Sequence, residues 1–182
     1  MWNYPTKCAV KELPLIPNHT PECIGEYYKK MYPYSFGTML NATSDHWFFG
    51  HLNFYVFSKV MWDHKTDVNA LLKEYFSLMF GKGAPMMKKF YDDLEYNWFR
   101  KIISNTVDTG LGPKTQVPRD FEIWTKIYNS KTVDMFNAEF DKAEKIAASD
   151  KEALKRVKFI RAEFWKPVLT GMERFRKSSE IN

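Results

Sequence analysis

The stretch that decides the fold is LNFYVFSKVMWDHKTDVNALLKEYFSLMFGKGAPMMKKFYDDLE, residues 52–95. Its first part, residues 52–62, is apolar almost all round, which predicts a helix without a clean polar face. Helices of that kind belong in the interior of a protein. We therefore expect residues 52–62 to be the packing centre, with the other helices around them.

Two amphipathic helices are predicted after this segment. Thr66 or Asp67 is placed to cap the first, because a side-chain oxygen there can accept from free backbone amides. Gly81 and Gly83 stand where a left-handed C-terminal cap is expected. Pro85 suits the first turn of the second helix. Apolar residues recur at helical spacing in both: Val68, Leu71, Leu72, Tyr75, Phe76, Met79, then Met87, Phe90, Tyr91, Leu94, Trp98, Ile102.

The flanking regions differ from each other. Residues 1–50 read as an irregular segment with a short helix at 22–31 and short strands at 2–4 and 35–40. Residues 51–182 read as a helical domain, interrupted at 104–118 by a loop rich in glycine and proline.

Several boundaries are predicted in the C-terminal half. Thr132 is expected to cap one helix, and Ser149 with Glu152 to form a capping box for the last one. Pro167 is expected to kink that last helix, because its ring displaces a carbonyl one turn back. The predicted fold class is mainly α, a multi-helix antiparallel bundle-like domain with at most two short strands near the N-terminus.

Composition bounds the function only loosely. The net charge of +5 is modest, and it disfavours a nucleic-acid partner. No stretch reaches the roughly 18–20 apolar residues that span a bilayer, and residues 1–10 lack the pattern of a signal peptide. A membrane partner is therefore not expected. Cys8 and Cys23 read as two free thiols in preference to one disulfide.

No motif in the sequence indicates a cofactor or a metal. Phosphate-binding, dinucleotide-binding, nucleophile-elbow and HExxH patterns do not occur. The histidines (His19, His46, His51, His64) lack a metal-ligand spacing. We predict a solvated helical face for Asp92, Asp93 and Glu95, and a helix stop or cap at Asp63. We expect neither a cofactor nor a metal.

A family resemblance appears in the same central stretch. YVFSKVMWD, DVNALLKEYFSLMFG and APMMKKFYDDLE resemble, in order, the C-terminal region of alpha-glucuronidase-like glycoside hydrolases and their uncharacterised bacterial relatives with a C-terminal domain of unknown function. The matching residues are Asn53, Tyr55, Lys59, Trp62, Asp63, Phe80, Gly81, Ala84, Pro85, Tyr91, Leu94 and Glu95. A second pair of helices, FDKAEKIAASDKEALKRVKFIRAEF, is similar through Asp141, Ala143, Asp150, Arg156, Val157 and Arg161.

The resemblance implies that the catalytic domain of the family is separate from the region that this chain represents. In that family a catalytic (β/α) barrel lies N-terminal to this region, and such a barrel takes about 250 residues. A chain of 182 residues cannot contain it. Residues near Trp2–Tyr4 and Phe36–Gly37 would fall at the ends of the last barrel strands. The catalytic carboxylates would then lie outside this chain, so catalytic residues are not expected in it.

The resemblance also suggests where a sugar would bind. Barrel enzymes keep their sites at the C-terminal ends of the strands, where Asn41, Asp45 and His46 offer polar contacts and Trp47 offers a stacking ring. Trp2 and Tyr4 would line the same mouth. The alternative is that the aromatic residues of this segment only anchor the loop in the core.

Two functions of different classes remain. The first is a non-catalytic helical domain, resembling the C-terminal part of a carbohydrate-active protein, with an upstream barrel as its partner. In the longer protein it would belong to a glycoside hydrolase. The second is a standalone helical interaction subunit that docks on a larger assembly.

Overall fold

The computed structural model describes residues 2–3, 16–40 and 48–179. A two-residue strand, β1 (Trp2–Asn3), comes first, and helix α1 (Pro21–Met31) follows. The chain then forms a 3-10 turn, η1 (Tyr32–Tyr34), and strand β2 (Met39–Leu40). The short helix predicted at 22–31 is confirmed, and a proline at its start fits the rule that the first helical position needs no amide donor.

Strands β1 and β2 pair in parallel, with Trp2 opposite Met39 and Asn3 opposite Leu40. Helix α1 lies in the connection between them. This is the order of a β-α-β unit, because parallel strands need a long crossover that is usually helical. The predicted N-terminal strands therefore exist, although each is only two residues long.

The central stretch forms three helices. Helix α2 (His51–Trp62) is followed by α3 (Val68–Phe80), whose N-cap Asp67 accepts from the Ala70 amide. Gly81 has a positive φ of 50° and ends α3, as predicted, whereas the same prediction was wrong for Gly83, whose φ is −75°. A 3-10 turn, η3 (Gly81–Gly83), leads into α4 (Ala84–Asn97).

The expectation that residues 52–62 form the packing centre was wrong. Helix α2 buries one face, formed by Leu52, Asn53, Val56 and Val60, whereas Trp62 at its end is 93% exposed. Burial follows the i, i+4 spacing of those four residues. Apolar side chains between them lie on the flanks of the helix.

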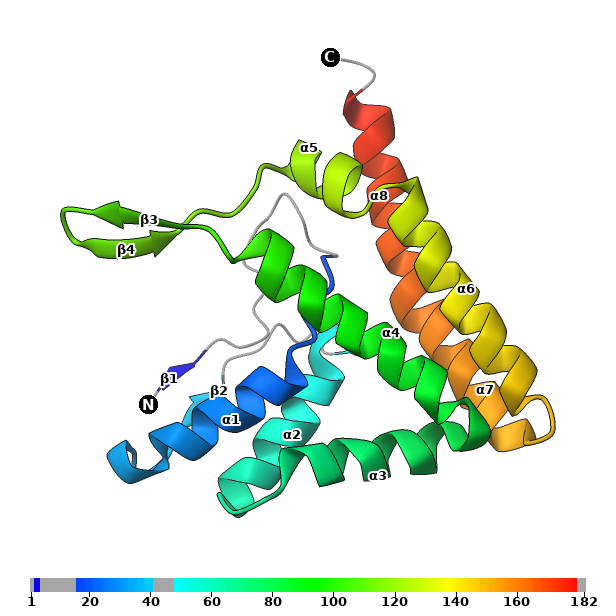
Figure 1. Ribbon diagram of the computed structural model, residues 1–182, viewed down its shortest axis with the longest axis horizontal. Coiled ribbons are helices and arrows are strands. Elements are labelled where there is room, and N and C mark those ends of the chain that lie inside the picture. Colours follow the sequence, from blue (N-terminus) through cyan, green and yellow to red (C-terminus); the bar gives the residue numbers. More distant parts are fainter. Residues whose placement is uncertain (1, 4–15, 41–47, 180–182) are drawn as a thin grey trace.

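The core centres on α4 instead, which crosses the middle of the molecule in Figure 1. Phe90 is fully buried and lies against rings from its own helix and from the C-terminal helices. Its ring partners are Tyr91, Phe136, Phe140, Phe164 and Trp165, at centroid distances of 4.6–6.1 Å. Aromatic pairs at such distances add stability beyond the area that they bury.

A β-hairpin follows α4, where a loop was expected at 104–118. A π-helical turn, η4 (Trp98–Ile102), ends α4, and then β3 (Thr106–Thr109) pairs antiparallel with β4 (Gly112–Thr115). Gly112 has a φ of 107°, so glycine permits the tight turn. The hairpin projects away from the helices (Figure 1), and it was missed because its exposed strands carry no apolar periodicity.

The C-terminal half forms a second group of helices. A short helix α5 (Asp120–Glu122) and a π-helical turn η5 (Ile123–Ile127) precede α6 (Ser130–Ala147). Helix α7 (Lys151–Ile160), a π-helical turn η6 (Arg161–Trp165) and α8 (Lys166–Ser179) then run as one rod. Figure 1 shows that this rod lies antiparallel to α6.

The predicted caps of these helices need correction. Asn129, not Thr132, caps α6 by accepting from the Thr132 amide. Asp150, one residue after the predicted Ser149, caps α7 by accepting from the amides of Glu152 and Ala153. Where a kink was expected from Pro167, a π-helical turn directly precedes α8, and Pro167 is the second residue of α8.

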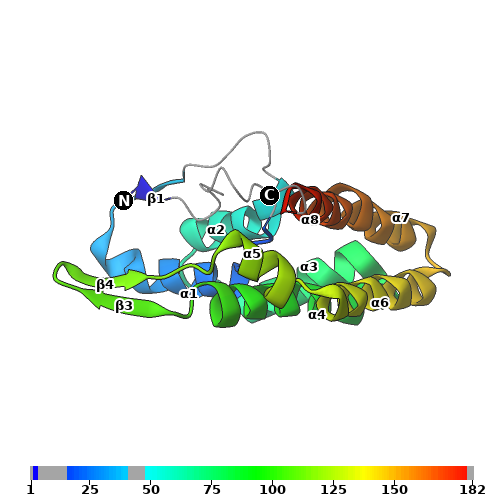
Figure 2. The same cartoon turned by 90° about the horizontal axis from the view of Figure 1, so that it is seen from above.

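The arrangement is mainly α, as predicted. Seen from above, α1, α4 and α6 lie in one layer and α2, α7 and α8 in the other (Figure 2). Helix α3 runs at a wide angle to α4 in Figure 1, so antiparallel packing holds for some neighbours only. Among the described residues, no helix combines the length and the apolarity that a bilayer span requires.

Candidate functional site

The structure describes only one of the six residues predicted to bind a sugar. Tyr4, Asn41, Asp45, His46 and Trp47 lie outside the described residues. The backbone of Trp2 lies in β1, beside Met39. Asn3 and Leu40, the last residues of the two strands, are paired with each other.

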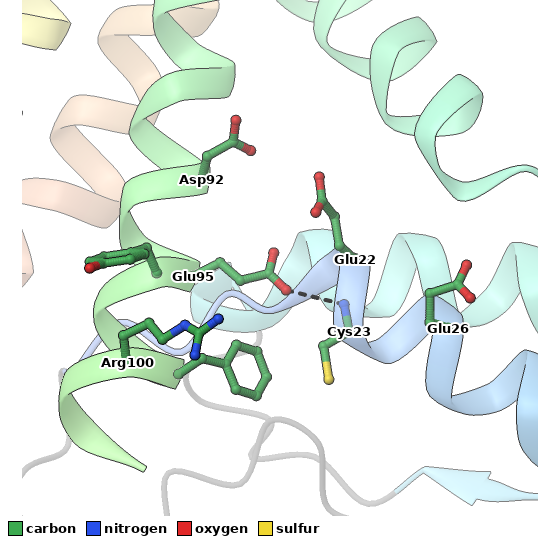
Figure 3. A pocket seen from close by; sticks show the side chains of 8 residues that line it. Glu22, Cys23, Glu26, Asp92, Glu95 and Arg100 are labelled. Carbon is green, nitrogen blue, oxygen red and sulfur yellow. Dashed lines mark hydrogen bonds between the residues drawn. The ribbon is translucent and has the colours of Figure 1, made fainter. Parts of the chain in front are cut away.

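A cleft of about 780 Å³ lies between α1 and α4 and is shown in Figure 3. Acidic side chains gather in it from both helices, together with a thiol, two aromatic rings and one arginine. Its lining residues are Glu22, Cys23, Glu26, Asp92, Glu95, Tyr96, Phe99 and Arg100. The prediction that Glu95 lies on a solvated face was wrong, because the hydrogen bond that joins Glu95 to the start of α1 connects residues far apart in the sequence.

Glu95 points across the cleft toward the start of α1 (Figure 3). Its carboxylate accepts a hydrogen bond from the Cys23 amide at 3.1 Å. Thr20, at the N-cap of α1, supplies no side-chain bond to that helix. Glu95 thus satisfies a free amide at the helix N-terminus, where a negative charge is favoured.

The environment of Glu95 also changes its acidity. Burial raises the pKa of this carboxyl to about 7, and the neighbouring charges of Glu22 and Asp92 act in the same direction, against the Cys23 amide. A carboxyl with such a pKa is a usual feature of a general acid. Hydrolysis of a glycoside would need a second carboxyl group facing it across the substrate.

Of the other carboxylates near the cleft, Glu22, Asp92 and Asp93 contact lysines of α4, whereas Glu26 pairs with Lys29 on α1. Lys88 contacts Asp92 at 2.7 Å on its own helix and Glu22 of α1 at 3.6 Å. Lys89 pairs with Asp93 and, at 2.6 Å, with Glu139 of α6. These contacts tie α4 to its neighbours on both sides. They give the acidic residues a structural role, which differs from the purely solvated face that was predicted.

A pH-dependent prediction follows from Glu95. Its pKa in the fold lies above the usual 4.5, so its contribution to stability is full below about pH 4.5 and is lost as the pH rises through about 7. In Glu95→Gln the side chain no longer titrates. We expect the stability of the wild type relative to Glu95→Gln to fall by about 2 kcal/mol between pH 4.5 and pH 8.

Urea unfolding across this pH range measures the difference. Glu26→Gln is the control, because Glu26 is exposed and pairs with Lys29 on its own helix. A difference between the wild type and Glu95→Gln that stays constant with pH would contradict the assignment of a raised pKa to Glu95.

Two histidines that lack a sequence signal for pairing meet in the core. His19 is fully buried, and its Nε2 lies 3.3 Å from Nδ1 of His51. His51 also contacts the Phe48 carbonyl and the Tyr75 hydroxyl. Among the described residues, no group of three or more histidine, cysteine or acidic side chains is arranged to hold a metal.

The fold and the cleft together define a mainly α-helical domain with a β-α-β unit at its start. The sequence profile of DUF4838, a domain of unknown function, matches residues 1–92. The chain belongs to this family, and the match covers the β-α-β unit and most of the central helices. No curated protein and no solved structure matches the chain.

Proposed function

We propose that this chain is a non-catalytic helical domain of a carbohydrate-active, glycoside-hydrolase-like protein, and that it supports a parallel barrel supplied by another segment. The observation that carries the proposal is the parallel pairing of β1 with β2 through a connection that contains α1. All-parallel sheets occur almost only in α/β folds with helices on both faces. Two strands of two residues each are too small to be such a sheet alone.

The residues that carry the resemblance to alpha-glucuronidase-like proteins support this proposal through their structural roles. Arg161 pairs with Asp141 at 2.7 Å and with Glu144 at 2.9 Å, which joins η6 to α6. Arg156 donates to the Leu78 carbonyl at 3.0 Å, at the C-terminal end of α3. Such motif residues specify how the helices pack, and packing is the task of a supporting domain.

The contacts of the acidic side chains point in the same direction. Glu95 holds the first turn of α1, while Asp92 and Glu22 share Lys88. A hydrolase needs one carboxyl poised to donate a proton and another free to attack or to activate water. In this cleft Glu95, Glu22 and Asp92 are engaged in contacts that link α1 to α4, and Glu26 pairs with Lys29 of its own helix.

The isolated chain is therefore expected to lack glycosidase activity. Aryl glycosides, including an aryl glucuronide, should be cleaved at the rate of buffer alone. The measurement is release of the aryl group over hours at several pH values. Turnover that disappears in Glu95→Gln and persists in Glu26→Gln would refute the proposal and make the cleft an active site.

The sugar-binding role of the six candidate residues also remains a proposal. Trp47 is the best single probe, because a ring stacked on a sugar face contributes most of the contact there. Replacement by alanine should abolish oligosaccharide binding in the assembled protein. Unchanged binding would support the alternative, in which Trp47 only anchors its loop.

A second candidate, an interaction subunit, is favoured by apolar side chains exposed where α1 and α2 end. The exposed residues are Tyr32, Tyr34, Phe36, Met39, Met61 and Trp62. Monomers rarely expose contiguous apolar patches without an interaction role. Sedimentation velocity separates the two cases, because a monomer across the accessible concentrations argues against an obligate assembly subunit.

A further inference from the structure

The contact between His19 and His51 has a defined proton arrangement. The Phe48 carbonyl can only accept, so His51 Nδ1, which lies 2.8 Å from it, carries the proton. When the His51 ring is neutral, its Nε2 accepts a hydrogen bond from the Tyr75 hydroxyl at 3.2 Å. Since His19 Nε2 faces the protonated His51 Nδ1 at 3.3 Å, it must also accept. Burial lowers the pKa of both rings and so favours the arrangement in which both are neutral.

A positive charge on either ring disturbs this contact. A proton on His19 Nε2 would face the N–H of His51 Nδ1. The hydrogen bond between the two rings would then be replaced by repulsion between two N–H groups. A charge on His51 would lie at the first residue of α2, where the helix dipole disfavours a cation. Burial lowers the pKa of both histidines, most strongly that of His19, and their mutual repulsion lowers the pKa of His19 further.

The surroundings offer no compensation for a charge among the described residues. The groups that face the pair from the adjacent segments are aromatic: Phe48, Tyr75 of α3, Tyr91 of α4 and Phe164 of η6. His19 Nδ1 and the Tyr91 hydroxyl have no hydrogen-bond partner there. Neither tyrosine supplies a negative charge at neutral or acidic pH, because burial raises the pKa of both.

Residues 16–20 are the segment that could leave the core if the histidine contact is lost. This segment has no regular secondary structure, yet all of its side chains are buried. Besides the histidine contact, Asn53 holds it through two hydrogen bonds, from the Thr20 amide at 2.8 Å and to the Asn18 carbonyl at 3.0 Å. Helix α2, on the other side of the contact, is fixed by its own buried face.

We propose that the His19–His51 contact is an acid-sensitive latch that holds residues 16–20 in the core at neutral pH and releases them as the pH falls. The sign follows from the neutral state of the pair. Because the fold favours the unprotonated rings, the contact is fully stabilising above the ordinary histidine pKa of about 6.5 and is lost at lower pH. Release would free the residues immediately before α1 while the α4-centred core stays closed.

Amide exchange measured by NMR tests the latch. The Thr20 amide, corrected for intrinsic exchange rates, should lose about tenfold of its protection between about pH 7.5 and about pH 5, while amides of α4 and α6 keep theirs. Protection of Thr20 that does not change with pH would overturn the proposal. A parallel loss in all helices would also overturn it, because that result means global unfolding.

A variant pair makes the test specific. In His19→Gln the segment carries no titrating ring, so the protection of Thr20 should become independent of pH, whatever its absolute level. His64→Gln is the matched control, because His64 stacks on Tyr32 outside the core and its loss should leave the pH dependence intact. A pH dependence that persists in His19→Gln would contradict the latch. The wild-type measurement remains decisive if that variant does not fold.

Discussion

Phe90→Ala is expected to destabilise the protein by about 4 kcal/mol. The ring is fully buried and contacts five other aromatic rings from α4, α6 and η6. Its removal takes away the transfer free energy of a large side chain and leaves a cavity that rigid neighbours cannot fill. The free energy of unfolding, obtained from urea titration followed by tryptophan fluorescence, measures this loss.

Phe121→Ala is the control for this change. Phe121 lies in α5 and is 57% exposed, so its truncation should cost less than about 1 kcal/mol. Similar losses for the two variants would mean that α4 is not the centre of the core. An unfolded Phe90→Ala protein beside a folded Phe121→Ala protein would agree with the account.

Asn53→Leu should destabilise the protein by about 3 kcal/mol, although the leucine side chain has the same branched shape as that of asparagine. Asn53 is buried, and its side-chain amide is shared between the Thr20 amide and the Asn18 carbonyl. Leucine would leave both backbone groups buried without a partner. Each such group costs about 1–3 kcal/mol.

The matched substitution is Asn69→Leu, at an exposed position of α3. Urea unfolding of this variant should differ from the wild type by less than about 0.5 kcal/mol. If Asn53→Leu were equally mild, residues 16–20 would not depend on the asparagine bridge. The loss for Asn53→Leu should also appear as faster exchange of the Thr20 amide.

The sequence was sufficient for the elements whose signals are local. The bounds of α2 and the cap at Asp67 follow from spacing and from capping chemistry, and the structure confirms them. The hairpin at 106–115 was not predictable in this way. Its strands are largely exposed, so their sequence shows no alternation of apolar and polar residues. The caps at Asn129 and Asp150 were displaced by one to three residues, since several neighbouring side chains there can cap a helix.

The candidate site was less predictable because it depends on long-range contacts. Glu95 and Cys23 are 72 residues apart, and His19 and His51 are 32 residues apart. No spacing rule joins such pairs before the positions of α1, α2 and α4 relative to one another are known. The apolar composition of residues 52–62 also led to the wrong prediction that α2 is the packing centre. Composition alone does not distinguish a helix that is buried on one face from one that is buried all round.

The most direct test of the account is association with a parallel barrel. The (β/α) barrel segment of an alpha-glucuronidase-like glycoside hydrolase would be expressed separately and mixed with this chain, and the complex would be measured by titration calorimetry. We predict saturable one-to-one binding that weakens at least about tenfold in Met39→Pro, because proline in β2 removes a backbone donor. Circular dichroism would establish that the helices of that variant remain intact. Absence of binding at concentrations of about 100 μM, or binding that Met39→Pro leaves unchanged, would contradict the claim that β1 and β2 belong to a larger parallel sheet.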